Sequence, residues 1–99
     1  MYIFIRGGLN MKPKKVTVYM SSGCTHCHNE LTWLEKNKIA FSRKVIDKDQ
    51  DAYDTFLQLN IRGVPYTIVE FENGEKIDIL GFNQSQLEQI LLENYLEKG

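Results

Sequence analysis

Residues 16–27, VTVYMSSGCTHC, decide how this chain is expected to fold. The first part of the stretch, residues 16–20, is β-branched and aromatic, which predicts a buried strand ending at the turn-forming residues 21–23, SSG. Two cysteines, Cys24 and Cys27, follow directly with two residues between them. The stretch therefore predicts a strand, a tight turn and a Cys-x-x-Cys pair where a helix begins.

The residues after this pair predict a helix with one buried side. Cys27, Leu31 and Leu34 recur at positions i, i+4 and i+7, which is the spacing of an apolar stripe on an amphipathic helix. Polar side chains flank the stripe: Asn29, Glu30, Glu35 and Lys36. We therefore expect the stripe to face the core and its polar flanks to face solvent.

A second strand and a second helix are expected next in the chain. Residues 41–46 predict the strand, because Phe41, Val45 and Ile46 within it are apolar. Either Asp47 or Asp49 can cap the helix that follows. The buried face of this helix is predicted to consist of Tyr53, Phe56, Leu57 and Asn60.

The remaining residues predict a β-hairpin and a final helix. Residues 66–71 and 76–80 have the composition of strands, and Asn73-Gly74 between them is a strong hairpin signal. Residues 83–86, NQSQ, resemble a capping box. The buried face of the helix that it opens is predicted to be Leu87, Ile90 and Leu91. The order β-α-β-α-β-β-α implies an α/β fold, with a four-stranded mixed sheet flanked by helices.

Length and composition fit one domain. The chain has 99 residues, of which 42% are hydrophobic and 25% charged, enough to bury a core. We assign residues 13–99 to this domain and residues 1–12 to an N-terminal extension that is expected to be loosely ordered. A net charge of -1 excludes attraction to nucleic acid or membranes through overall charge. Since no apolar run reaches the length of a signal-peptide core or a membrane span, we expect a cytoplasmic monomer.

The cysteine pair carries the predicted chemistry. A helix N-terminus offers unpaired N–H groups and the positive end of the helix dipole, both of which favour a thiolate at Cys24. Two intervening residues put Cys27 about one helical turn further on, close enough for a disulfide and more deeply buried. We therefore predict that Cys24 attacks and Cys27 resolves, with no metal ion involved.

Three motifs together resemble the glutaredoxin-like proteins of the thioredoxin superfamily. They are CTHC at residues 24–27, the Val64-Pro65 step before a strand, and GFNQ at residues 81–84. The resemblance covers about residues 15–96 and implies a thioredoxin-like fold. It also implies that the Val64-Pro65 bond is cis and that the backbone there receives the substrate opposite the dithiol. Without the resemblance, Pro65 fits a strand-starting proline equally well.

The resemblance implies an enzyme, a thiol-disulfide oxidoreductase acting on protein or small-molecule disulfides with no cofactor beyond its own disulfide. The implied substrate-binding residues are Thr25, Val64, Pro65, Gly81, Phe82, Asn83 and Lys15. Many glutaredoxins bind glutathione at a step of small residues, whereas the Gly81-Phe82 step here is similar to relatives that take electrons from thioredoxin reductase. The electron donor, glutathione or another small thiol or a reductase, therefore stays open.

Two histidines belong to the same motif. The Cys-x-His-Cys order resembles oxidising disulfide catalysts, in which the histidine stabilises the thiolate, so we assign His26 a catalytic role beside the cysteines. The alternative for His26 is a solvated first-turn residue, and for His28 solvation is the favoured interpretation.

The same motif suggests three other interpretations. Residues 24–28 also match Cys-x-x-Cys-His, the attachment pattern of c-type haem, but the surrounding β-α-β pattern argues against it. A zinc site is excluded because the two histidines crowd one turn and no further Cys or His is present. The remaining alternative is a non-catalytic redox sensor or binding module of the same fold.

Overall fold

A computed structural model of the protein describes residues 13–93. The elements, in chain order, are β1 (Pro13–Met20), α1 (Thr25–Lys36), β2 (Ser42–Val45), α2 (Gln50–Gln58), β3 (Tyr66–Phe71), β4 (Lys76–Leu80), α3 (Gln84–Leu87) and the π-helical segment η1 (Glu88–Glu93). The predicted element order is confirmed, with η1 continuing the last helix. The expected extension, residues 1–12, lies outside the described residues.

The four strands form one mixed sheet in the order β2-β1-β3-β4. Strands β1 and β2 are parallel, as they must be when a helix such as α1 connects them across one face of the sheet. The pairs β1–β3 and β3–β4 are antiparallel. The expected four-stranded mixed sheet is therefore confirmed, and β1 lies in its interior with a neighbour on each side.

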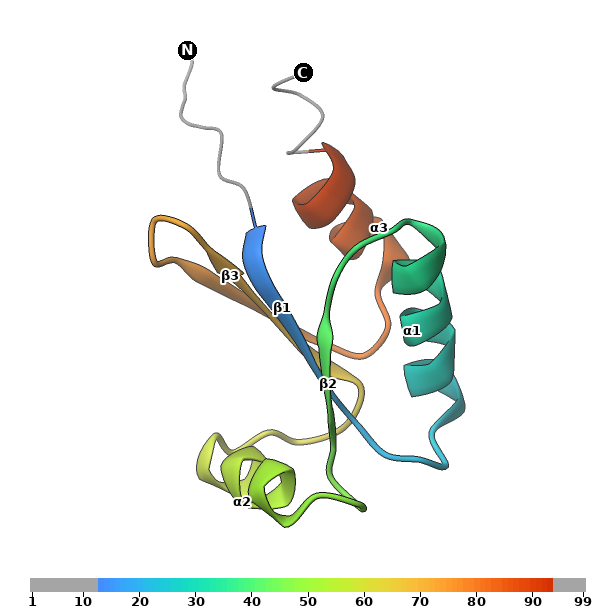
Figure 1. Cartoon of the computed structure of the whole chain (residues 1–99), viewed down its shortest axis with the longest axis vertical. Helices are drawn as coiled ribbons and strands as arrows, with labels where there is room; N and C mark the ends of the chain where they lie inside the picture. Colours follow the sequence, from blue (N-terminus) through green and yellow to red (C-terminus); the bar gives the residue numbers. More distant parts are fainter. Residues whose placement is uncertain (1–12, 94–99) are drawn as a thin grey trace.

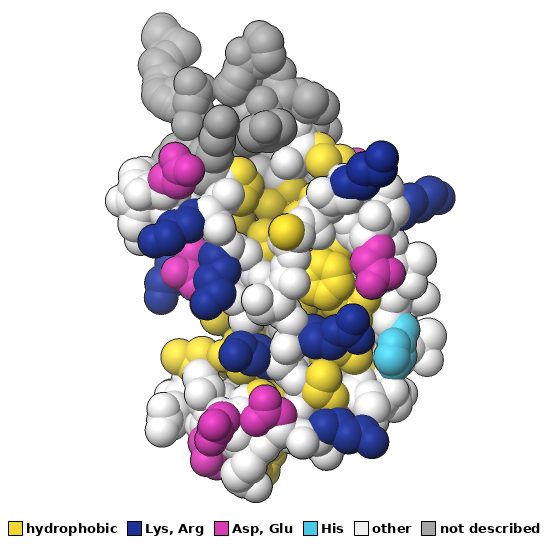
Figure 2. Space-filling model, in the orientation of Figure 1, with side chains coloured by type: hydrophobic (Ala, Val, Ile, Leu, Met, Phe, Trp, Pro, Cys, Tyr) yellow, Lys and Arg dark blue, Asp and Glu magenta, His cyan; other side chains and the backbone are white. Residues whose placement is uncertain are grey.

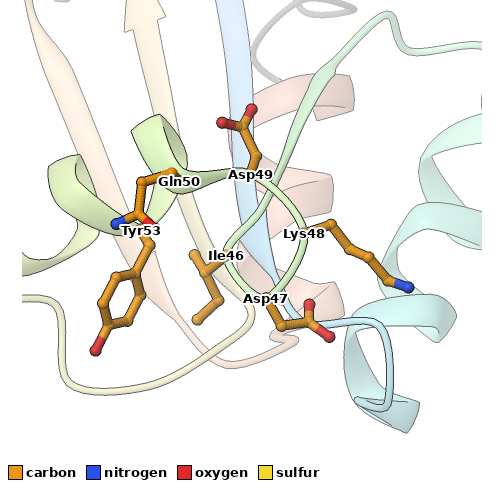
Figure 3. A pocket seen from close by; sticks show the side chains of 6 residues that line it. All are labelled: Ile46, Asp47, Lys48, Asp49, Gln50 and Tyr53. Carbon is orange, nitrogen blue, oxygen red and sulfur yellow. The ribbon is translucent and has the colours of Figure 1, made fainter.

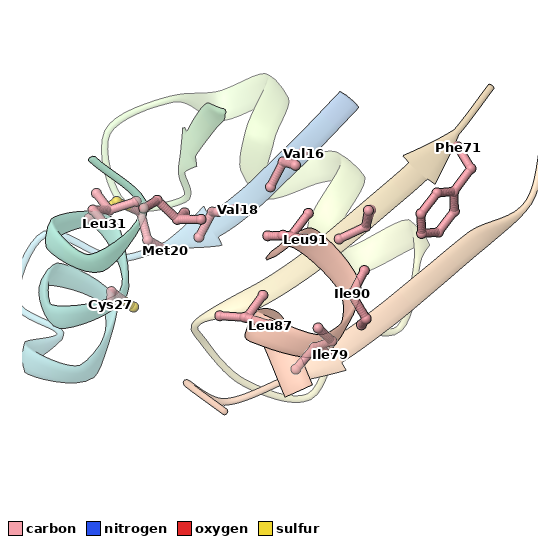
Figure 4. Close-up of a cluster of buried hydrophobic side chains, with 12 residues drawn as sticks. Val16, Val18, Met20, Cys27, Leu31, Phe71, Ile79, Leu87, Ile90 and Leu91 are labelled. Atoms are coloured by element: carbon pink, nitrogen blue, oxygen red, sulfur yellow. The ribbon is translucent and has the colours of Figure 1, made fainter. Parts of the chain in front are cut away.

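Helices cover both faces of the sheet, with α1 and α3 on one side and α2 on the other (Figure 1). All five residues from 16 to 20 in β1 are buried, as expected for a strand covered on both faces. Val16, Val18 and Met20 join the main apolar cluster with residues of α1 and the last helix (Figure 4). On the other face, the ring of Tyr19 lies 6.4 Å from that of Phe56 in α2.

The helix starts and the hairpin follow the local sequence. Asp49, one of the two predicted caps, accepts hydrogen bonds from the backbone N–H groups of Asp51 and Ala52. Asn83 caps α3 by accepting the N–H of Gln86, as the capping-box motif predicts. Gly74 has a φ of 93° in the turn between β3 and β4, a conformation that glycine adopts without strain.

The predicted buried face of α2 is wrong in part. Tyr53 and Leu57 are 41% and 53% exposed, and Asn60 is exposed beyond the end of the helix. Ala52 is the buried residue of α2, and Phe56 is half-buried. The physical reason is that this short helix approaches the sheet mainly through Ala52 and Phe56, which leaves the outer part of its apolar surface in water.

The molecular surface carries mixed charge. On the face shown in Figure 2, Lys and Arg side chains are interspersed with Asp and Glu side chains around exposed apolar atoms. This distribution agrees with the near-zero net charge of the sequence. Recognition of a partner on this face would therefore depend on local contacts and not on one large patch of a single sign.

Candidate functional site

Cys24 and Cys27 form a disulfide at the N-terminus of α1, with their Cα atoms 5.2 Å apart. The two sulfurs differ in their surroundings. Cys24 is half-buried at the surface, whereas Cys27 is 0% exposed and belongs to the apolar core. A reagent from solvent therefore meets Cys24 first, while Cys27 is held in place behind it.

Cys24 is also the N-cap of α1. Its sulfur accepts the backbone N–H of Cys27 at 3.1 Å, and its carbonyl oxygen accepts the N–H of His28 at 3.1 Å as the helix begins. The sulfur thus occupies the position where a capping oxygen would satisfy an unpaired donor. An anionic sulfur makes a stronger hydrogen bond there and interacts favourably with the helix dipole, so this geometry favours a Cys24 thiolate in the reduced protein.

The opposite wall of the site is the loop that precedes β3. The Val64–Pro65 peptide bond is cis, and the Val64 carbonyl oxygen lies 4.0 Å from the Cys24 sulfur. The Pro65 carbonyl oxygen accepts the N–H of Gly81 at 2.8 Å, which joins this loop to the end of β4. Gly81 has a φ of 85°, a conformation that residues with a side chain rarely adopt. The structure therefore brings Val64, Pro65 and Gly81 together beside the dithiol.

The turn before the cysteines is held from two sides. Asp47 accepts the backbone N–H of Ser22 at 2.9 Å and also its hydroxyl, and these hydrogen bonds lower the pKa of the Asp47 carboxyl. His28 Nε2 donates to the Ser22 carbonyl oxygen at 2.8 Å. His28, expected to be merely solvated, is exposed but hydrogen-bonded to the turn that leads to Cys24.

A surface hollow lies next to this turn. It is lined by Ile46, Asp47, Lys48, Asp49, Gln50 and Tyr53 (Figure 3). Asp49 already caps α2, and Asp47 is bonded to Ser22, so both carboxyl groups in the hollow have structural partners. The two carboxyl groups of the hollow therefore stabilise the turn and the start of α2, and neither is a reactive group of the dithiol site.

Other predicted site residues lie close to the dithiol in sequence or space but differ in what their side chains do. Thr25 and His26 are exposed in the first turn of α1, directly beside Cys24. Phe82 is half-buried and packs against the apolar core. Asn83 is committed to capping α3. Phe82 and Asn83 thus have clear structural roles at this edge of the site.

Lys15 is the predicted site residue that the structure does not bring to the dithiol. It lies near the start of β1, opposite Glu70 on β3, whereas Tyr19 and Tyr66 pair at the end of the sheet near Pro65. The four steps from Lys15 to Tyr19 span roughly 13 Å of strand at 3.3 Å per residue. An exposed lysine at the far end of β1 cannot contact a small substrate held at Cys24.

Glu30 was expected on the polar, solvent-facing flank of α1, and its place beside the site was not predicted. Glu30 is 0% exposed, and the Thr67 hydroxyl of β3 donates to its Oε2 atom. Burial raises the pKa of the Glu30 carboxyl, and the Thr67 hydrogen bond opposes this in part. One signal was present: Glu30 follows Cys27 by three positions, so the full buried set of α1 is i, i+3, i+4 and i+7.

Within residues 13–93, no three His, Cys, Asp or Glu side chains gather into a group that can hold a metal ion. Among the helices of the same range, none has the length and apolar character needed to cross a membrane.

Solved structures similar to this chain belong to the thioredoxin and glutaredoxin group. The thioredoxin-like protein BC3987 is 26% identical, with a TM-score of 0.65 and coverage of 78% of this chain and 100% of that protein. A glutaredoxin from Archaeoglobus fulgidus is 22% identical, with a TM-score of 0.62 and coverage of 76% and 83%. Oxidised thioredoxin O2 from Arabidopsis thaliana is 18% identical, with a TM-score of 0.62 and coverage of 82% and 74%.

These likenesses establish a thioredoxin-like fold. Among curated proteins, none matches the sequence of the chain. The family model for glutaredoxin matches residues 16–72, a segment that includes the last five residues of β1, both cysteines and the Val64–Pro65 step. The dithiol at the start of α1 and this match together show that the chain belongs to the glutaredoxin family.

Proposed function

We propose that the protein is an enzyme, a thiol-disulfide oxidoreductase that exchanges electrons between its Cys24–Cys27 dithiol and the disulfides of proteins or small molecules. The observation that carries the proposal is the asymmetric disulfide at the N-terminus of α1. Cys24 is accessible and receives an N–H hydrogen bond, whereas Cys27 is fixed in the core behind it. This arrangement suits one attacking and one resolving sulfur.

The reaction proceeds in two exchanges. The Cys24 thiolate attacks one sulfur of the substrate disulfide, a mixed disulfide forms, and the other substrate sulfur leaves as a thiolate. Cys27 then attacks Cys24, the bond from Cys24 to the substrate breaks, and the second substrate thiolate leaves. The substrate disulfide gains two electrons, and the protein's dithiol becomes the disulfide seen in the structure.

Substrate docks at the loop before β3. The Val64 carbonyl faces Cys24, so an extended chain that pairs with the backbone there presents its own disulfide to the nucleophile. Pro65 and Gly81 shape this wall, and the exposed Thr25 flanks it. Lys15 has no part in this binding surface because of its position at the other end of β1.

The electron donor is either a small thiol, such as glutathione, or a protein, thioredoxin reductase. Phe82 packs against the core and Asn83 caps α3, so both are already engaged at the step where a glutathione carboxylate would bind. The choice between the two donors stays open. The protein acts without a prosthetic group, as a cytoplasmic monomer.

Disulfide reduction assays test the proposal and the choice of donor together. Reduction of insulin and of hydroxyethyl disulfide is measured with glutathione and, separately, with thioredoxin reductase. We expect turnover with one donor, no turnover for Cys24→Ser, and a trapped Cys24 mixed disulfide for Cys27→Ser. A disulfide that forms and opens without turnover with either donor would instead indicate the redox sensor.

A further inference from the structure

A buried carboxyl lies one helical turn after the resolving cysteine. Glu30 follows Cys27 by three positions in α1, so the two side chains share a face of the helix, with Cβ atoms about 5–6 Å apart. Both residues are 0% exposed. The carboxyl and the resolving sulfur therefore lie in the same water-excluded part of the site.

The Glu30 carboxyl is only half satisfied by hydrogen bonds. Its Oε2 atom accepts the hydroxyl of Thr67, whereas Oε1 is buried and has no hydrogen-bond partner among the residues that the structure describes. Buried polar atoms without partners are rare in folded proteins because they destabilise the native state, and those that persist call for an explanation. A transient partner at Oε1, such as a proton taken from a neighbour, is one explanation.

Thr67 connects this carboxyl to the substrate loop. It lies two residues after Pro65, and side chains two positions apart share one face of a strand. Thr67 pairs with Val18 of β1 and Ile79 of β4, and both of these side chains are buried and apolar. The hydrogen bond between Glu30 and Thr67 thus connects α1, which begins at the dithiol, to β3, the strand that follows the docking loop.

The surroundings suit a proton acceptor. Burial is the main cause of the raised pKa of Glu30, the Thr67 hydroxyl is the opposing one, and no charged side chain contributes. A carboxyl whose pKa is moved upward is a better base near neutral pH than an ordinary exposed glutamate. On the buried face of α1 the titratable neighbour of Glu30 is Cys27, while the core residues that β1, β4 and the last helix supply are apolar.

We propose that Glu30 accepts the proton of the Cys27 thiol during the resolving step, an inference that rests on the function proposed above. The proton moves from Cys27 to the Glu30 carboxylate as the Cys27 sulfur attacks Cys24. The bond between Cys24 and the substrate sulfur breaks, and its electron pair leaves with the substrate thiolate. In the reverse direction, the protonated Glu30 returns its proton to Cys27 when the disulfide is opened.

The two exchanges can be timed separately with dithiobis(nitrobenzoate), an aromatic disulfide that releases a coloured thiolate at each step. Reduced protein is mixed with the reagent in a stopped-flow instrument. The first release reports attack by Cys24, and the second reports attack by Cys27. Both rates are measured from pH 6 to pH 10 for each protein.

Three variants separate proton transfer from packing. Glu30→Gln keeps the size of the side chain and removes the base. Glu35→Gln makes the same change at an exposed position of the same helix and serves as the matched control. Thr67→Val removes the hydrogen bond to Glu30 and leaves the carboxyl in place.

We expect Glu30→Gln to slow the second release by about 100-fold at pH 7, the lower end of what general acid–base groups contribute. The deficit should narrow as the pH rises above about 8.5, the ordinary pKa of an exposed cysteine thiol, because more of Cys27 then ionises without a base. Glu35→Gln should match the wild-type protein, and Thr67→Val should stay within a few-fold of it. In the wild-type protein itself, the second rate should fall less steeply below pH 8.5 than the thiolate fraction of an unassisted cysteine.

If Glu30→Gln releases both coloured thiolates at the wild-type rates, the role of Glu30 is overturned, whereas the proposed function is not. A deficit that persists equally at every pH, or one that Thr67→Val reproduces, would also overturn the role, since both indicate packing. If Glu30→Gln does not fold, a wild-type second rate that simply follows the thiolate fraction would overturn the role. Absence of the first release in the wild-type protein would overturn the proposed function, and the role of Glu30 with it.

Discussion

The two faces of the sheet differ in how tightly their helices pack. On the α1 and α3 face, Leu34 and Leu87 are 0% exposed, and Cys27 is part of the same core. On the α2 face, Tyr53 and Leu57 remain 41% and 53% exposed. The dithiol therefore lies on the tightly packed face, where the loss of even one methylene group is expected to lower stability. On the α2 face, apolar side chains remain incompletely buried.

The largest expected effect comes from the tightly packed face. Leu34→Ala removes a fully buried side chain from α1 and should lower the free energy of unfolding by about 2–5 kcal/mol. Urea denaturation of the oxidised protein measures this value. A loss below 1 kcal/mol would mean that the α1 face is packed no more tightly than the α2 face.

The matched change on the α2 face is Leu57→Ala. More than half of the Leu57 surface is in water, so the substitution leaves little cavity and should change stability by less than about 1 kcal/mol. The same urea titration provides the measurement. If Leu57→Ala costs as much as Leu34→Ala, the contrast between the two faces is wrong.

Because the Glu30 carboxyl is buried on the α1 face, the stability of the protein is expected to depend on pH. The pKa of Glu30 is raised in the folded protein, so its contribution to stability is present below the unfolded pKa and is lost as pH rises through the folded pKa. Glu30→Gln should therefore be more stable than the wild-type protein at pH 7, by about 1–3 kcal/mol, and close to it at pH 4.

Urea denaturation of the oxidised proteins at pH 4 and pH 7 provides the comparison, because the disulfide removes the cysteines from the titration. Glu35→Gln, on the exposed side of α1, controls for the loss of one negative charge. Equal differences at the two pH values would show that Glu30 does not titrate between them.

The smallest expected effect lies at the turn before the dithiol. Asp47 accepts two hydrogen bonds from Ser22, which lower its pKa, so this contribution is present at neutral pH and is lost as pH falls through the lowered folded pKa. Asp47→Asn should lose part of the bonding at neutral pH and should alter the reaction rate of Cys24 more than global stability.

Cys24 alkylation rates at pH 7 and pH 3.5, measured beside urea midpoints, test this prediction. Asp54→Asn, an exposed change in α2, is the control. An Asp47→Asn protein with an unaltered Cys24 rate would show that the Ser22 contacts do not position the nucleophile.

Much of the fold was predictable because local signals and packing agree. The apolar stripe of Cys27, Leu31 and Leu34 is the buried face of α1, and Asn73-Gly74 forms the turn between β3 and β4. These patterns are set by helical and strand periodicity and by backbone preferences, which act over a few residues. Local sequence was therefore sufficient for the element order and for the place of the dithiol.

The predictions that were wrong concern residues whose burial or location depends on tertiary packing. Glu30 reads as polar, and its burial depends on Thr67 of β3, a partner 37 residues away. Leu57 reads as core, and its exposure depends on how closely α2 approaches the sheet. Lys15 precedes the dithiol in sequence, but the extended strand carries it to the far end.

The geometry at the start of α1 makes Cys24 the nucleophile of the proposed reaction. The most direct measurement is alkylation of the reduced protein by iodoacetamide across pH, with the adducts mapped by mass spectrometry. We expect Cys24 to be labelled first, with an apparent pKa below the ordinary value of about 8.5, while Cys27 stays protected. Preferential labelling of Cys27, or equal labelling of both with an ordinary pKa, would contradict it.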